Sequence, residues 1–90
     1  MTVTLKIDGR DFVAEFVKSE DAGYSPGKLL LDLPNGDFIS VYKSGRKWTE
    51  ALISGNVCRR STSHSTRQDA LTSAAESLAS AVLDRESMAS

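Results

Sequence analysis

The clearest structural signal in the sequence lies in the last quarter of the chain, at residues 66–86, TRQDALTSAAESLASAVLDRE. It is the only segment that keeps a helical period over several turns, and its small and apolar residues recur three and four positions apart: Leu71, Ala74, Ala75, Leu78, Ala81 and Val82. Thr66 is a suitable N-cap, and Asp69 follows three residues later, where a carboxylate favours the positive end of a helix. The pattern predicts one amphipathic helix over residues 66–86 whose alanine-rich face can approach a sheet closely.

The first eighteen residues predict a β-hairpin. Residues 2–7 alternate polar and apolar side chains, and Asp8-Gly9 suits a type I′ turn, in which both central residues have positive φ. With Asp8-Gly9 as the loop, Leu5 faces Phe12, and one side of the hairpin collects the apolar residues. These are Val3, Leu5, Ile7, Phe12, Ala14 and Phe16.

Residues 29–61 predict a meander of short strands. Residues 29–33, 38–43, 47–54 and 57–61 have strand character, and three dipeptides between them favour tight turns: Asn35-Gly36, Ser44-Gly45 and Gly55-Asn56. Residues 19–28 form the longest predicted loop, in which Tyr24 either offers an aromatic contact to a partner or packs down to hold the loop.

We therefore expect a single α+β domain over residues 1–90. It would consist of an N-terminal hairpin (1–18), a meander (29–61) and a helix (66–86), with the helix packed on one face of an antiparallel sheet of five to six strands. Ninety residues leave room for only one core.

The composition is that of an ordinary globular domain, with 40% hydrophobic and 26% charged residues. No apolar run approaches the roughly 18–20 residues of a membrane span, and residues 1–4 lack the features of a signal peptide. The lone cysteine, Cys58, cannot form an intrachain disulfide, and one Cys with one His cannot build a zinc site. We expect a cytoplasmic protein without metal or cofactor.

Basic residues gather in the middle of the chain. Residues 43–67 carry six basic side chains and one acidic side chain, a net charge of +5, whereas residues 1–42 and 68–90 each carry −3. The candidate binding residues are this basic set and the tryptophan within it: Lys43, Arg46, Lys47, Trp48, Arg59, Arg60 and Arg67.

Three interpretations fit the basic segment. Its side chains could balance the acidic ends and cover an exposed sheet, contact an anionic protein partner, or combine phosphate contacts with base stacking on Trp48. If Gly55-Asn56 is the hairpin loop, Leu52 faces Arg59 and Ala51 faces Arg60, so the two arginines would point to opposite faces.

No pattern indicates catalysis. His64 lies in a serine-rich connector without a nucleophile motif, so we expect a solvated residue rather than a catalytic base. Cys58 beside Arg59 could be a reactive thiol if it is exposed, but a small buried side chain is the simpler expectation. We therefore expect a protein that is not an enzyme.

Residues 38–83 run strand, turn, strand, turn, strand, Ser/Thr connector and helix, with the first turn at Ser44-Gly45-Arg46-Lys47-Trp48 and the helix opening at Thr66-Arg67-Gln68-Asp69-Ala70. This order resembles the three-stranded sheet and helix of integrase arm-type DNA-binding modules, and is similar to small bacterial and phage domains of the same plan. The resemblance implies that Arg46, Trp48 and either Arg59 or Arg60 would contact DNA. The N-terminal hairpin, the acidic helix and the overall charge of −1 depart from that family.

The sequence as a whole favours a small non-catalytic binding domain that occupies the surface of a partner protein, of the kind that phages and mobile elements encode as accessory proteins. Nucleic-acid binding through the basic sheet face around Arg46, Trp48 and Arg59 is the alternative. The first would need an exposed aromatic patch, around Trp48 or Tyr24, or an open edge strand that could also pair with a second copy. The second would need the basic residues on one continuous face.

Overall fold

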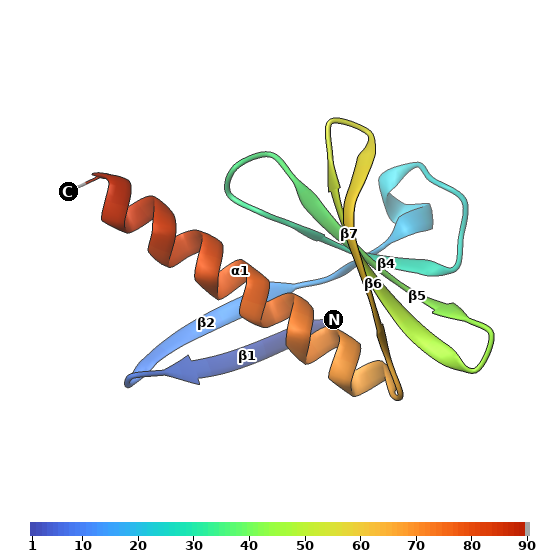
Figure 1. The fold of residues 1–90 in the computed structure, drawn as a ribbon, viewed down its shortest axis with the longest axis horizontal. Helices are drawn as coiled ribbons and strands as arrows, with labels where there is room; N and C mark the ends of the chain where they lie inside the picture. The colour runs from blue at the N-terminus through green and yellow to red at the C-terminus, as the bar shows by residue number, and fades with distance from the viewer. Residues whose placement is uncertain (90) are drawn as a thin grey trace.

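A computed structural model, which describes residues 1–89, contains seven strands and one long helix (Figure 1). The elements in chain order are β1 (Thr2–Ile7), β2 (Arg10–Glu15), β3 (Val17–Lys18), the 3₁₀ helix η1 (Ser19–Ala22), β4 (Lys28–Asp32), β5 (Phe38–Ser44), β6 (Lys47–Ser54), β7 (Val57–His64) and α1 (Arg67–Ala89). Strands β3 to β7 form an antiparallel meander in sequential order, and β1 and β2 form a separate two-stranded sheet. The predicted α+β class is confirmed.

The hairpin β1–β2 has the predicted register, with Leu5 opposite Phe12 and Val3 opposite Ala14. Asp8 and Gly9 have φ values of 52° and 78°, as a type I′ turn requires. Phe12, Ala14 and the following Phe16 are buried. At Phe16 the chain leaves the hairpin for the larger sheet: its N–H donates to the Met1 carbonyl at 2.7 Å, and its own carbonyl accepts from the Met1 amino group at 2.9 Å.

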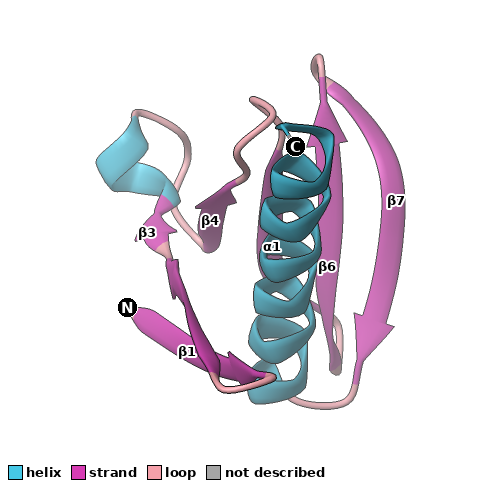
Figure 2. Ribbon diagram, turned by 90° about the vertical axis from the view of Figure 1, so that its left-hand side faces the viewer, coloured by secondary structure: helices cyan, strands magenta, loops and turns pink. Residues whose placement is uncertain are grey.

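Helix α1 begins where its N-cap predicts. The Thr66 hydroxyl accepts a hydrogen bond from the Asp69 backbone N–H at 3.1 Å, which satisfies one of the amides that a helix start leaves free. The face turned to the sheet is made mostly of alanine, with one large side chain, Leu71: Ala70, Leu71, Ala74, Ala75 and Ala79 are all buried. Figure 2 shows α1 crossing one face of the larger sheet with the hairpin at its side.

The core lies between α1 and the sheet. Its large members are Phe16, Leu31, Ile39, Val41 and Leu71, and half-buried Trp48 and Leu52 pack against them. Beyond this core the C-terminal end of α1 projects past the sheet (Figure 1), and Leu83 and Met88 are exposed there.

One ion pair holds the hairpin to the projecting end of α1. Two nitrogens of the Arg10 guanidinium donate to the two carboxylate oxygens of Glu86, both at 2.6 Å. This hydrogen-bonded contact lowers the pKa of Glu86 and raises that of Arg10. None of the helices in residues 1–89 has the hydrophobic length that a membrane crossing requires.

Several predicted boundaries need correction. The segment predicted as residues 29–61 extends from Lys28 to His64, because the serine-rich segment continues β7 instead of forming a connector. The helix has the predicted N-cap, Thr66, but continues to Ala89, beyond the predicted end at residue 86. Within the predicted hairpin segment 1–18, Val17 and Lys18 pair with β4 and belong to the larger sheet.

Two turns also differ from their predictions. At Asn35-Gly36 only Gly36 has positive φ, and the Gly36 N–H donates to the Leu33 carbonyl at 3.2 Å, so Pro34, Asn35 and Gly36 form a three-residue loop. Pro34 accounts for this, since a two-residue loop at Asn35-Gly36 needs the N–H of residue 34 to donate to residue 37 and proline has none; the Leu33 N–H donates to the Asp37 carbonyl instead, at 2.9 Å. The next turn is centred on Gly45-Arg46, one residue later than predicted.

The register of β6 and β7 was predicted wrongly beyond the turn. Ile53 pairs with Cys58 as expected, but Leu52 pairs with Arg60 and Ala51 with Ser61, because a β-bulge leaves Arg59 without an opposite residue. The bulge places Arg60 on the same face as Leu52, toward α1.

Candidate functional site

The structure distributes the predicted basic residues over several surfaces. Lys43 lies opposite Trp48 and therefore shares its face, toward α1, whereas Lys47 is one residue away and points to the other side. Arg46 occupies a turn, Arg59 is the bulge residue of the edge strand, and Arg60 reaches Ser77 of α1. Arg67 opens α1, and its guanidinium contacts the Met1 sulfur at 3.2 Å.

These residues form no continuous basic face. Trp48 is half-buried against the core, and its face of the sheet is the one that α1 crosses. DNA contact through Arg46, Trp48 and Arg59 stays a prediction.

The face of the large sheet opposite α1, which we call the open face, has a distinct relief. Its middle row of side chains crosses the strands as Ser61, Ala51, Ser40 and Leu30, since these residues pair in sequence from β7 to β4. The rows on either side are bulkier: one contains Cys58, Ile53 and Phe38, and the other contains Ser63, Thr49, Tyr42 and Lys28. Small residues between larger ones produce a trough.

This trough contains a hollow of about 460 Å³. Phe38, Tyr42 and Ile53 are only half-buried along it, and Tyr24 stands at its end with 62% of its surface exposed. The Lys28 ammonium lies 4.8 Å from the centre of the Tyr42 ring, so one wall also carries a positive charge.

Residues 19–28 border the same hollow. Ser19 is buried, its hydroxyl donates to the Ser25 carbonyl at 2.7 Å, and it accepts from the Lys28 N–H at 3.2 Å. The loop is therefore held by Ser19, and Tyr24 does not pack down to hold it. This outcome leaves an exposed aromatic side chain beside the trough.

The floor of the trough has an unsatisfied polar atom. Ser40 is 4% exposed, and its hydroxyl has no hydrogen-bond partner. A buried hydroxyl without a partner costs about 1–3 kcal/mol relative to a paired one. The trough therefore offers a mostly apolar surface with one free hydroxyl at its base.

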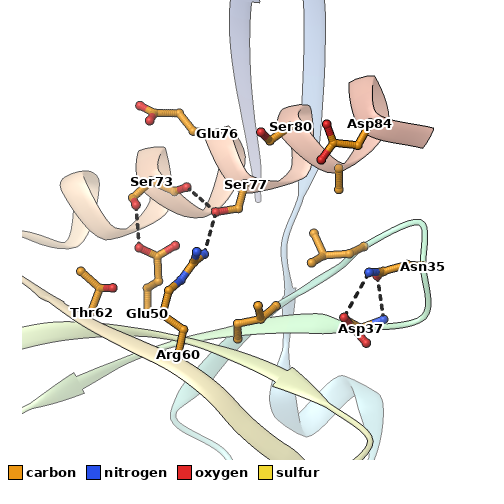
Figure 3. A pocket seen from close by; sticks show the side chains of 13 residues that line it. Asn35, Asp37, Glu50, Arg60, Thr62, Ser73, Glu76, Ser77, Ser80 and Asp84 are labelled. Carbon is orange, nitrogen blue, oxygen red and sulfur yellow. Dashed lines mark hydrogen bonds between the residues drawn. The ribbon is translucent and has the colours of Figure 1, made fainter. Parts of the chain in front are cut away.

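A second hollow lies between α1 and strands β6 and β7, and we call it the helix-side groove (Figure 3). It has a volume of about 520 Å³. Polar side chains of α1 form one wall, Glu50, Arg60 and Thr62 rise from the strands, and the loop after β4 closes one end with Asn35 and Asp37.

Glu50 is the most unusual residue of this groove. It comes from the middle of β6, where Trp48 and Leu52 are its neighbours on the face toward α1, and it is only 4% exposed. Its Oε1 accepts hydrogen bonds from the Ser73 hydroxyl at 2.6 Å and from His64 Nε2 at 2.8 Å. Its Oε2 is buried and has no partner.

The group Ser73, Glu50 and His64 has the residue types of a hydrolase triad but not its order. In a triad the histidine lies between the hydroxyl and the carboxylate and accepts the hydroxyl proton. Here Glu50 lies between them, and both Ser73 and His64 donate to it, so no base is placed on the serine. The contacts satisfy one oxygen of a buried carboxylate and do not activate a nucleophile.

Other reactive groups are placed as follows. Cys58 is exposed, which corrects the expectation of a buried side chain, and it lines the trough. His64 is half-buried against Glu50, so it is not a solvated loop residue. Within residues 1–89, no three His, Cys, Asp or Glu side chains come close enough together to hold a metal ion.

Comparisons with family models, with curated proteins and with solved structures found no match to this chain. The resemblance to integrase arm-type modules therefore stays a prediction.

The sequence contained a signal for each hollow. Glu50 lies between Trp48 and Leu52 on an apolar strand face, which indicates a buried charge. Its contact with His64 was not predicted from the sequence, because His64 was expected in a connector instead of in β7. The trough follows from Ser40 and Ala51, which are small residues on the face that α1 does not cover. Their alignment depends on the strand register, so only the structure shows that they lie side by side.

Proposed function

We propose that this chain is a non-catalytic interaction domain whose open face binds an amphipathic helix of a partner protein. By doing so it would occupy part of the partner's surface, as a small accessory protein of a phage or mobile element does. The observation that carries the proposal is the trough, whose floor of small residues lies between rows that contain Phe38 and Tyr42.

The width of the trough supports a helix as the occupant. Phe38 and Tyr42 are four residues apart on β5, which corresponds to about 13 Å at about 3.3 Å per residue. An α-helix with its side chains is about 10–12 Å across. Ser40 and Ala51 in the floor would let a helix come close, as the alanines of α1 do on the other face.

The chemistry of the walls supports an apolar contact. Phe38, Tyr42, Ile53 and Tyr24 offer aromatic and aliphatic surface, and aromatic side chains dominate the energetics of protein interfaces. A small polar residue on the partner could pair with the Ser40 hydroxyl. Nucleic acid is less well matched, since Lys43, Lys47 and Arg60 are divided between opposite sides of the sheet.

The single cysteine provides a direct test. Cys58 lines the trough and is exposed, so a benzophenone maleimide attached there would sample its occupant. After irradiation in extract of the native cells, we expect one cross-linked protein, and the linked peptide should come from an amphipathic helix. A shortened synthetic form of that peptide should then bind the purified domain.

Two matched variants complete the test. Ala51→Leu fills the floor and should abolish the cross-link, because the helix could no longer approach. A control with Cys58→Ser and Asp11→Cys carries the probe on the exposed side of the hairpin and should give no such product. Equal products from both positions would contradict the proposal, and so would a cross-link to nucleic acid or to a second copy of the chain.

A further inference from the structure

The starting observation is the imbalance at the Glu50 carboxylate. Oε1 receives two hydrogen bonds, from Ser73 and His64, whereas Oε2 is buried and receives none. An ionised carboxylate oxygen without a donor carries a large desolvation penalty, and a protonated one would lack an acceptor for its own hydrogen. In either protonation state Oε2 therefore lacks a hydrogen-bond partner in the isolated chain.

The surroundings of Glu50 carry negative charge. The helix-side groove is lined by four carboxylates and one cationic side chain: Asp37, Glu50, Glu76 and Asp84 against Arg60. Hydroxyl and amide oxygens of Ser73, Ser77, Ser80, Thr62 and Asn35 add further acceptors. A hollow lined by one sign of charge concentrates ligands of the opposite sign.

The Arg60 guanidinium is not bonded to Glu50. Its Nη2 donates to the Ser77 hydroxyl at 3.4 Å, near the outer limit of a hydrogen bond, and it forms no ion pair with the Glu50 carboxylate. Figure 3 shows the guanidinium beside Glu50 and close to Ser77. The Arg60 side chain is exposed, so it can change its conformation without leaving a buried position.

We propose that the helix-side groove binds an alkylammonium or guanidinium group, with Glu50 Oε2 accepting its inner hydrogen bond. The binding group would displace the Arg60 side chain from its weak contact with Ser77. Such a group occurs on free polyamines and on lysine or arginine side chains of a peptide, and the test below distinguishes these sources. The site lies on the opposite side of the sheet from the trough and does not depend on the function proposed for it.

The groove also favours a ligand with a second cationic group. Ser77 and Asp84 are seven residues apart on α1, which is about 10 Å along the helix axis. A ligand whose first ammonium reaches Glu50 would therefore extend along α1 toward Asp84. A linear diamine or triamine, or a basic side chain on an extended peptide, has a suitable length and shape.

The chain has two built-in reporters for this site. His64 is the only histidine, and its Nε2 is bonded to Glu50 Oε1, so its ring resonances can be assigned without ambiguity. Trp48 is the only tryptophan and lies directly across the ladder from His64. A donor that arrives at Oε2 changes the charge distribution of the carboxylate that His64 contacts, and should move both signals.

The experiment is a titration of the complete chain at low salt with three probes: spermidine, agmatine, and a short peptide with one central arginine and neutral neighbours. We expect saturable shifts of the His64 ring signals with at least one probe, and weaker binding at higher salt. Binding of spermidine or agmatine alone would identify a free polycation as the ligand. Binding of the peptide alone would identify a partner side chain.

Three variants sharpen the result. Glu50→Gln keeps an oxygen for Ser73 and His64 but puts an NH₂ donor where Oε2 stood, so affinity should fall by at least about tenfold, as expected for loss of a buried charge-assisted contact. Arg60→Met removes the competing cation and should tighten binding. Asp69→Asn, on exposed surface outside the groove, should leave binding unchanged.

Other outcomes would overturn the proposal. They are the absence of a saturable His64 shift with all three probes, an unchanged affinity in Glu50→Gln, and an equal loss of affinity in Glu50→Gln and Asp69→Asn, which would indicate unspecific attraction. Binding of inorganic phosphate at Arg60 in preference to the amines would also refute it. Circular dichroism and the melting temperature of each variant would show that the fold is retained.

Discussion

The two faces of the five-stranded sheet are built from the same strands but have different surroundings. On one face Leu31, Ile39 and Val41 lie under α1 and are almost completely buried. On the other face Phe38, Tyr42 and Ile53, which alternate with them or lie beside them in the ladder, remain half-exposed around the trough. The difference between the faces lies in what covers them and in the size of their central residues.

In this fold an apolar sheet face is not by itself evidence of a core. The covered face is buried by α1 of the same chain, whose alanines let its backbone come close to the sheet. The open face has apolar side chains, Phe38, Tyr42 and Ile53, around a floor of small residues, and residues 1–89 leave a hollow there. Predictions can therefore be made for pairs of positions, one on each face.

The largest contrast is expected for isoleucine truncation. Ile39 is 0% exposed, so Ile39→Ala should destabilise the domain by about 2–5 kcal/mol, through lost apolar burial and a residual cavity. Ile53→Ala on the open face should cost clearly less, because Ile53 is partly hydrated already. Urea unfolding followed by Trp48 fluorescence measures both. Equal losses would mean that the open face is covered in solution.

The next contrast concerns alanines. Ala74→Leu places a larger side chain between α1 and the sheet and should cost about 1–3 kcal/mol by overpacking. Ala51→Leu adds the same atoms to the trough, where space exists, and should change stability much less. Thermal unfolding of the two variants compares them. A larger loss for Ala51→Leu would show that the trough is closed in the free protein.

A smaller contrast is expected for two buried serines that border the trough. The Ser19 hydroxyl makes two hydrogen bonds, so Ser19→Ala should cost about 1–2 kcal/mol, and should also loosen the loop at Tyr24. Ser40→Ala removes a hydroxyl without a partner and should be neutral or stabilising. Chemical denaturation gives the free energies, and hydrogen exchange of the Lys28 amide reports on the loop. Destabilisation by Ser40→Ala would reveal a partner for its hydroxyl.

The smallest effect is expected for the exposed ion pair between Arg10 of the hairpin and Glu86 of α1. The Arg10 contact lowers the pKa of Glu86, so its contribution to stability is present above the unfolded pKa of glutamate and is lost as the pH falls through the folded pKa of Glu86. In Arg10→Gln the pKa of Glu86 should rise toward its ordinary value. A carboxyl NMR titration checks this. An ordinary Glu86 pKa in the unaltered protein would show that the contact does not persist in solution.

Much of the covered face could be predicted from the sequence, because local signals agree there. Asp8-Gly9 determines its own turn and thereby the hairpin register, and the alanine period with Thr66 as N-cap locates α1. The prediction at Asn35-Gly36 was wrong because Pro34, a single neighbour, selects another loop. The bulge at Arg59 has no comparable local signal: the residue is neither glycine nor in a turn motif, and only its pairing with β6 reveals it.

The candidate sites could be predicted less well, because they depend on residues far apart in sequence. In sequence His64 lies 14 residues and Ser73 lies 23 residues after Glu50. The three residues meet only when β7 and α1 are in place. The basic segment between residues 43 and 67 is continuous in sequence, but strand alternation divides it in space. Charge clusters along a chain therefore say little about charge clusters on a sheet.

The bulge at Arg59 also determines which deletions the protein can tolerate. In β6 the even-numbered residues face α1, and the bulge gives the end of β7 the same parity, so that Thr62 and His64 reach the Glu50 side. Loss of one arginine from Arg59-Arg60 would turn β7 into a regular strand in which all the remaining residues keep their present sides. Loss of Ser61 can also be absorbed by loss of the bulge, which brings Arg59 opposite Leu52 and Arg60 opposite Ala51 and leaves Thr62 and His64 opposite Glu50 and Trp48. The extra residue of the bulge thus lets this part of β7 lose one residue without moving Thr62 or His64 to the trough side.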